Sequence, residues 1–194
     1  MKTFAEYYAE LLRREGQKHL DLISTWDRNL IGKIKKDFKA AAQLTTVKGL
    51  KFEVRKDSSN QSIGNQIADH IAPALNIGLR VFTIENCPGS GYPDRFLARG
   101  NIKNIALEMK ATSNWKGKSN RTVLTSSSVK LRKKFEPPIY HLLCTVIYSI
   151  SEWTVTVGSL RLDFLEPTSN VNIRFEASVD QQILINSAHE SILI

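Results

Sequence analysis

The sequence predicts a single domain of the α/β (α+β) class, in which helices flank a central mixed β-sheet and a helical part comes first. Three observations predict this class. Apolar residues recur at helical spacing as far as Leu75. Apolar or alternating runs separated by turn residues follow, as far as about residue 177. The length of 194 residues fits one domain with a good core, and no repeat or linker divides it.

Helical structure is expected from residue 3 to about 44. The apolar side chains form two stripes, which are Phe4, Tyr7, Tyr8, Leu11 and Leu12 in the first and Leu30, Ile31, Ile34 and Phe38 in the second. Asp27 or Thr25 is the expected cap of the second helix, because short polar side chains accept hydrogen bonds from the first free N–H groups.

A short strand at 50–54 and a polar loop are expected before the next helix, which should be capped at or near Ser62. This helix has a clear apolar seam, since isoleucine or leucine occurs at every fourth position from Ile63 to Leu75. Pro73 is expected to kink or end it. The seam therefore faces the core, and the opposite face is polar.

Strands are expected at 79–84, 95–98, 105–111, 139–150 and 153–165, with a short helix in the segment TSSSVKLRKKF. The third of these strands ends a meander on which the seam helix packs. The alternation changes phase around Gly158, which predicts a bulge or a sharp bend. Residues 171–177 alternate once more.

The charge balance points to an anionic partner. The formal net charge is +8 and the isoelectric point is about 9.5, which favours an anionic polymer or surface. The cysteines, Cys87 and Cys144, are too few for a disulfide framework or a cysteine-rich metal site, so a reduced, cytoplasmic protein is expected. Neither a signal peptide nor a window long enough to span a membrane is present.

Three charged residues near the middle of the chain form the candidate active site. On a strand, Glu108 and Lys110 point to the same face. Asp94 follows Pro93 at the mouth of the preceding strand, so Asp94 and Glu108 converge on one cation if the two strands are neighbours. Carboxylate oxygens suit Mg²⁺, which lowers the pKa of a bound water. Lys110 can orient that water and stabilise charge on the phosphorus, which makes a site for phosphodiester hydrolysis.

The triplet of an acid, any residue and a lysine is a weak motif by itself. Asp37-Phe38-Lys39 also matches it, but lies in a predicted helix, where residues two apart do not share a face. The simplest alternative for Glu108 and Lys110 is a solvated, charged strand face. Their context, with Pro93-Asp94 before them and a basic segment after them, favours the catalytic interpretation.

These residues resemble the PD-(D/E)XK nuclease superfamily, with Pro93-Asp94 as the first half of its motif and Glu108-Met109-Lys110 as the second. The resemblance implies a restriction-endonuclease-like core at about 58–165. Members often add an acid from the helix before the motif, and Asp69 is the matching candidate, with Glu53 and Glu85 as competitors. The implied function is a Mg²⁺-dependent type II restriction endonuclease in the prokaryotic cytoplasm that cuts double-stranded DNA as part of restriction-modification. Such enzymes generally act as homodimers, and residues 1–50 are the candidate dimer surface.

The segment at 112–135 is expected to be a basic DNA-binding arm. No acid occurs between Glu108 and Glu136, whereas lysines and arginines are frequent there. The candidate DNA contacts are Asn114, Lys116, Lys118, Asn120, Arg121, Ser126, Ser127 and Lys130, which offer donors to phosphates and base edges. The alternative is a solvated basic loop. Trp115 either stacks on nucleic acid or closes the core.

Other functions remain open at this stage. A DNA-repair or junction-resolving nuclease of the same superfamily would need selectivity for structure instead of sequence. A DNA-binding protein without catalysis, in which the acid pair is incidental, and a nuclease that acts on RNA are further alternatives. No phosphate-cradling glycine loop of the ATPase type is present, so ATP-driven translocation is not expected.

Overall fold

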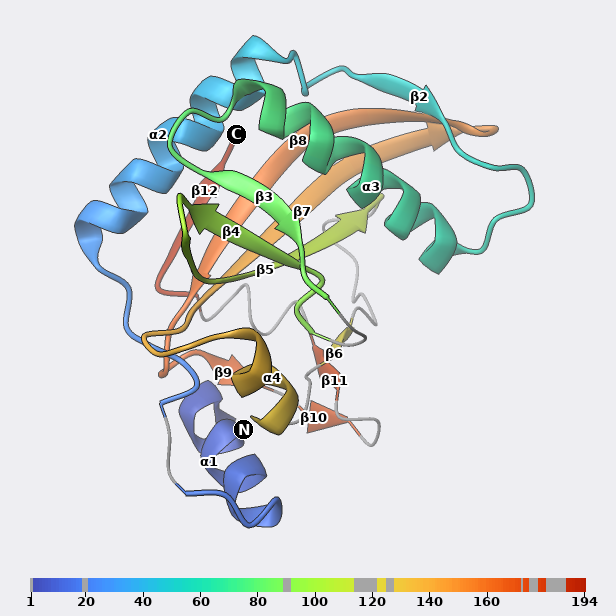
Figure 1. Ribbon diagram of the computed structural model, residues 1–194. Helices are drawn as coiled ribbons and strands as arrows, with labels where there is room; N and C mark the ends of the chain where they lie inside the picture. Colours follow the sequence, from blue (N-terminus) through green and yellow to red (C-terminus); the bar gives the residue numbers. More distant parts are fainter. Residues whose placement is uncertain are drawn as a thin grey trace.

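The computed structural model describes residues 2–18, 21–88, 92–113, 122–124, 128–171, 173–174, 178–180 and 188–194. Figure 1 shows the arrangement of its elements. The helices are α1 (Phe4–Arg14), α2 (Arg28–Leu44), α3 (Asn60–Gly78) and α4 (Ser128–Lys134). The strands are β1 (Lys2–Thr3), β2 (Lys51–Glu53), β3 (Thr83–Asn86), β4 (Arg95–Arg99), β5 (Ile102–Thr112), β6 (Thr122–Leu124), β7 (Tyr140–Ser151), β8 (Thr154–Leu165), β9 (Asn170–Val171), β10 (Ile173–Arg174), β11 (Ser178–Asp180) and β12 (Glu190–Leu193).

A mixed seven-stranded sheet forms the centre of the fold. Its strands lie in the order β12-β8-β7-β5-β4-β3, and β2 pairs with β8 beside this path. Strands β5 and β7 are parallel and the other neighbours are antiparallel. The prediction of a central mixed sheet flanked by helices is therefore confirmed. Two small sheets, β1-β9 and β10-β11-β6, lie apart from the central one.

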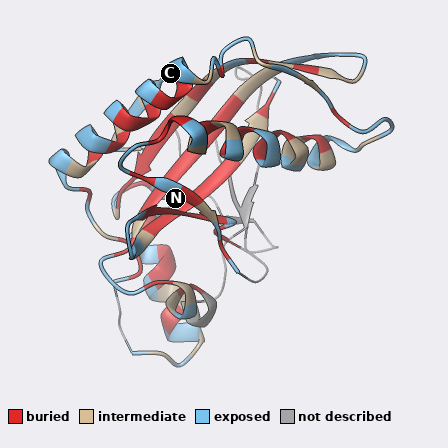
Figure 2. Ribbon diagram, turned by 45° about the horizontal axis from the view of Figure 1, so that its top comes forward, coloured by how far each residue is buried: buried red, intermediate tan, exposed pale blue. Residues whose placement is uncertain are grey.

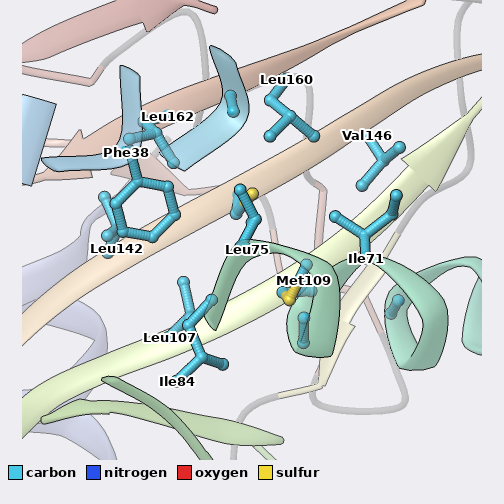
Figure 3. Close-up of a cluster of buried hydrophobic side chains, with 14 of the residues drawn as sticks. Phe38, Ile71, Leu75, Ile84, Leu107, Met109, Leu142, Val146, Leu160 and Leu162 are labelled. Carbon is cyan, nitrogen blue, oxygen red and sulfur yellow. The ribbon is translucent and has the colours of Figure 1, made fainter. Parts of the chain in front are cut away.

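Each face of the central sheet carries its own hydrophobic cluster. Helices α2 and α3 cover one face, where Phe38, Ile71 and Leu75 belong to the same hydrophobic cluster as Leu107 and Met109 of β5 (Figure 3). Helices α1 and α4 contribute to the cluster on the other face. Figure 2 shows the buried stripes of the helices turned towards the buried strands. Both N-terminal helices therefore bury their apolar stripes inside the chain.

The helix ends follow local capping chemistry. Asp27 caps α2, because its Oδ1 accepts the N–H of Leu30 at 2.8 Å, so Asp27 and not Thr25 has this role. The cap of α3 is Ser59, whose hydroxyl accepts the N–H of Ser62 at 3.2 Å. The predicted cap at Ser62 is thus three residues late. Pro73 does not end α3, which continues to Gly78.

The strand expected at 79–84 is displaced. Strand β3 begins only at Thr83, because the backbone N–H groups just before it do not join a ladder. Instead, the buried carboxylate of Asp37 accepts the N–H groups of Arg80, Val81 and Phe82 at 2.9, 2.9 and 3.0 Å. A side chain from α2 has replaced a neighbouring strand as their partner.

The predicted irregularity near Gly158 is confirmed. In the β7–β8 ladder, Ile147 pairs with Ser159 and Tyr148 pairs with Val157, so Gly158 is the extra residue of a bulge. A Cβ atom at Gly158 would lie 3.3 Å from the carbonyl oxygen of Ile147. The bulge resets the alternation and keeps Val157 and Leu160 both buried. Among the described residues, no helix has the length and apolar character needed to cross a membrane.

Candidate active site

The pairing of β4 with β5 places Asp94 opposite Glu108. The strands are antiparallel with Arg95 opposite Leu107. Extending that register by one residue sets Asp94 against Glu108, and residues opposite each other share a face. The contact is present, since the backbone N–H of Asp94 donates to Glu108 Oε2 at 3.3 Å. The two strands are therefore neighbours and Asp94 lies beside Glu108; that the two carboxylates hold one cation stays a prediction.

Glu108 and Lys110 lie on one face of β5, as their spacing predicts. Lys110 Nζ lies 2.6 Å from Glu108 Oε1. The glutamate side chain is 4% exposed and the lysine side chain 26% exposed. Because β4 begins only at Arg95, no strand within the described ranges pairs with β5 beyond Leu107 on the side of β4, and we call this side its open edge. Both residues line a cavity at this edge.

The surroundings of Glu108 favour its neutral, protonated form unless a cation lies nearby. Burial raises the pKa of Glu108 above its ordinary value, and the carboxylate of Asp94 raises it further, while the Lys110 ammonium lowers it in part. The single ammonium therefore does not offset burial and the second carboxylate. A divalent cation between the two acids would supply the missing positive charge, so the donor set fits Mg²⁺ with waters completing its shell.

A cavity of about 460 Å³ lies at this edge of the sheet. Its lining residues come from α3, from the ends of β3 and β4, and from the open part of β5. They are Gln61, Asn65, Ala68, Asp69, Asn86, Cys87, Tyr92, Asp94, Arg95, Glu108, Met109 and Lys110. All four residues predicted to be catalytic are in this set, although their roles stay predictions.

Of the three competing auxiliary acids, Asp69 is the one that lines the cavity. Glu85 pairs with Lys103 instead, and Glu53 belongs to β2, which pairs with β8. However, the carboxylate of Asp69 is held by Arg95, whose Nη2 lies 2.6 Å from Asp69 Oδ1. Within the described part of the chain, no group of three or more His, Cys, Asp or Glu residues is placed to hold a metal ion. The candidate ligand set is therefore the pair of acids predicted from the sequence.

A buried polar chain supports the turn that carries Asp94. The hydroxyl of Tyr92 lies 2.6 Å from His141 Nδ1, and His141 Nε2 lies 2.7 Å from the carbonyl oxygen of Leu22. A carbonyl only accepts, so Nε2 carries the proton and Nδ1 accepts from Tyr92. Burial lowers the pKa of His141 to about 4, so the ring stays neutral at pH 7. His141 thus links Tyr92, the residue before Pro93, to the segment between α1 and α2.

Three further residues at the cavity or the turn were not predicted from the sequence. Arg95 lies in the cavity wall, and Tyr92 fixes the turn. Lys134, the last residue of α4, donates to the carbonyl oxygen of Pro93 at 3.5 Å and also contacts Cys87. Strand alternation after Asp94 could have marked Arg95 as pointing to the α3 face. Nothing local marks Tyr92 or Lys134, because their partners are far away in the sequence.

The predicted DNA contacts fall in the least described part of the chain. Lys130 lies in α4, but its side chain is not described. The others lie outside the described residues, and they are Asn114, Lys116, Lys118, Asn120, Arg121, Ser126 and Ser127. Trp115 lies there too. The arm at 112–135 therefore remains a prediction from the sequence.

Comparison with known proteins gives one distant likeness. No family model and no curated protein matches this chain. Among solved structures, the crystal structure of the restriction endonuclease BglI bound to its DNA recognition sequence is similar, with 10% identity and a TM-score of 0.35. The match covers 98% of this chain and 89% of that one. At this similarity, the likeness carries no conclusion about activity.

Proposed function

We propose that this protein is a Mg²⁺-dependent endonuclease of the PD-(D/E)XK type that hydrolyses phosphodiester bonds in double-stranded DNA. The observation that carries the proposal is the antiparallel register that sets Asp94 against Glu108, with Lys110 paired to Glu108 on the same face. The more specific form of the proposal is a type II restriction endonuclease that cuts at a defined sequence.

Asp94 and Glu108 are the residues that would hold the cation. Bound there, the cation would lower the pKa of a coordinated water and offset charge on the scissile phosphate. Mg²⁺ is commonly bound by one or two carboxylates together with waters and substrate phosphates, so two acids are enough. A backbone carbonyl oxygen on the open edge of β5 would add a third protein ligand to the cation.

Lys110 is the residue proposed to assist the chemistry directly. Its ammonium carries several N–H donors and lies at the cavity with partial exposure. Part of its hydrogen-bonding capacity is directed to Glu108, and the rest can reach a water or a phosphate oxygen. In this place it orients the attacking water and stabilises the negative charge that develops on phosphorus.

The partner is expected to be DNA bound by the basic segment, and a homodimer would match a two-fold recognition site. The net charge of +8 supports an anionic partner. A dimer contact through residues 1–50 would have to use their exposed polar faces, because the apolar stripes of α1 and α2 are buried within the chain.

The test is digestion of a mapped DNA with Mg²⁺ and, in parallel, with a chelator, followed by sequencing of the ends. Discrete fragments that need Mg²⁺ are expected. Asp94→Ala should abolish cleavage and leave DNA binding largely intact, while Asp21→Ala, an exposed aspartate outside the cavity lining, should cut normally. Fragments without a common end sequence would point to a structure-selective nuclease. Binding without any cleavage would point to a protein that only binds DNA.

A further inference from the structure

Arg95 is an unusual member of the cavity wall. Its side chain is only 7% exposed, and its Nη2 is hydrogen-bonded to Asp69. Within the part of the chain that the structure describes, its Nε has no hydrogen-bond partner. A buried guanidinium is costly unless its donors are satisfied, so this arrangement is incomplete as it stands. Because Arg95 lines the cavity, an anion there can add acceptors to the guanidinium.

Asp69 does not close this arrangement off from solvent. Its side chain is 73% exposed, so it holds the guanidinium from the solvent side of the cavity. An ion pair with one partner in water contributes little to stability. A group with two acceptor oxygens that reaches the cavity can therefore share the guanidinium with Asp69. Phosphate oxygens match the planar fork of arginine in geometry and charge.

The position of Arg95 separates it from the cleavage chemistry. Neighbouring residues of a strand point to opposite faces, so Arg95 lies on the α3 face while Asp94 lies on the face of Glu108 and Lys110. Both faces open into the one cavity at the edge of β5. The cavity therefore has a cationic group on each side of that edge, Lys110 on one and Arg95 on the other.

We propose that Arg95 forms a second phosphate-binding position, which takes a backbone phosphate next to the one that is cut, and that Asp69 positions its guanidinium. This inference rests on the proposed function for the identity of the ligand. It also changes the role of Asp69, which acts through Arg95 and is not a ligand of the metal. The same cavity then holds two successive phosphates of one strand.

The direct test uses the wild-type protein. The ¹⁵N–¹H resonance of Arg95 Nε, assigned with Arg95→Lys, is followed while inorganic phosphate is added in the presence of Mg²⁺. A saturable shift is expected, and an equal concentration of chloride should not reproduce it. A resonance that does not respond to phosphate would overturn the inference. Arg95→Lys serves only to assign the resonance, and the titration itself is carried out on the wild type.

The second test measures DNA affinity against salt concentration, with Ca²⁺ in place of Mg²⁺ after checking that the duplex stays intact. Arg95→Gln should make the log-log slope shallower by about 0.9, the value for one phosphate contact. Arg99→Gln is the matched control, since Arg99 is an exposed arginine at the other end of β4, and its slope should not change. Equal slopes for wild type and a folded Arg95→Gln would contradict the proposal.

Asp69→Asn separates positioning from metal binding. If Asp69 positions Arg95, the variant weakens DNA binding and raises KM, while the Mg²⁺ concentration for half-maximal cleavage stays the same. An increase of tenfold or so in that concentration would make Asp69 a metal ligand and overturn its proposed role. Should phosphate shift Arg95 while the wild type fails to cut DNA, the proposed function fails and the phosphate position stands. If the wild type cuts DNA but the Arg95 resonance does not respond to phosphate, the proposed function stands and the phosphate position fails.

Discussion

Two triplets of the same kind serve opposite purposes in this molecule. Asp37-Phe38-Lys39 lies in α2, and Glu108-Met109-Lys110 lies in β5. In the strand, the acid and the lysine share a face and lie 2.6 Å apart. In the helix, Asp37 is buried at 5% exposure, whereas Lys39 is exposed. A helix has about 3.6 residues per turn, so positions two apart point nearly opposite ways.

The difference shows what turns a charged triplet into a candidate active site. The Asp37 carboxylate accepts hydrogen bonds from the backbone N–H groups of residues 80–82 and so joins α2 to the segment before β3. Glu108 keeps its carboxylate beside another acid and a cavity, because β4 brings Asp94 opposite it. Asp37 therefore stabilises the fold, whereas Glu108 lies where a further positive charge would stabilise its ionised form.

The largest contrast is expected from neutralising each acid. Glu108→Gln should lower cleavage on the order of 1000-fold or more, because it removes a proposed metal ligand. It should change the free energy of unfolding little, since burial already disfavours the charge there. Asp37→Asn should do the reverse, costing on the order of 3 kcal/mol of stability, because an amide has one acceptor for several N–H donors. Urea denaturation and DNA digestion of both variants measure this, and equal cleavage by the two would refute the contrast.

The two lysines offer a second contrast, of somewhat smaller size. Lys110→Ala should reduce kcat by about 100-fold to 1000-fold, because it removes stabilisation of the transition state. Lys39→Ala removes the same charge from the other triplet and should leave kcat unchanged. Single-turnover cleavage at saturating protein separates this effect from DNA binding. A similar loss in both variants would mean that total charge, and not the site, is responsible.

The buried His141 makes stability depend on pH. Its pKa is lowered to about 4 in the folded state, whereas an unfolded histidine titrates near 6.5. The neutral ring therefore contributes fully above about pH 6.5, and this contribution is lost as pH falls towards 4. The loss is on the order of 3 kcal/mol in total.

His141→Gln tests this, because the amide keeps a donor and an acceptor but does not titrate. The wild-type advantage in free energy of unfolding should shrink between pH 6.5 and pH 4 in urea denaturation. Taking the difference between the two proteins cancels the carboxyl groups of Glu108 and Asp163, whose pKa values burial raises. A difference that stays constant over that range would contradict the buried, neutral histidine.

The smallest expected effect concerns the basic segment. Lys118→Ala should weaken DNA binding and make the log-log dependence on salt shallower by about one unit, as for one phosphate contact. Lys39→Ala again serves as the control with the same loss of charge. Fluorescence anisotropy of a labelled duplex at several salt concentrations measures both, and an unchanged slope for Lys118→Ala would place that side chain off the phosphate backbone.

Much of the local structure could be predicted from residue patterns. The seam of α3, the bulge at Gly158 and the shared face of Glu108 and Lys110 were all predicted correctly. The start of β3 was not, because the partner of residues 80–82 is Asp37, more than forty residues earlier. Periodicity carries no information about which distant side chain will satisfy a backbone group.

By itself, the sequence determined the features that covalent geometry fixes within one element: the alternation that puts Glu108 and Lys110 together, and the net charge that favours an anionic partner. Only the tertiary structure decided which groups meet across elements. The register of β4 on β5 places Asp94 opposite Glu108. The packing of α3 places Asp69 at the cavity, where it pairs with Arg95. Register and packing follow from burying apolar faces on both sides of the sheet, and that burial depends on the whole chain at once.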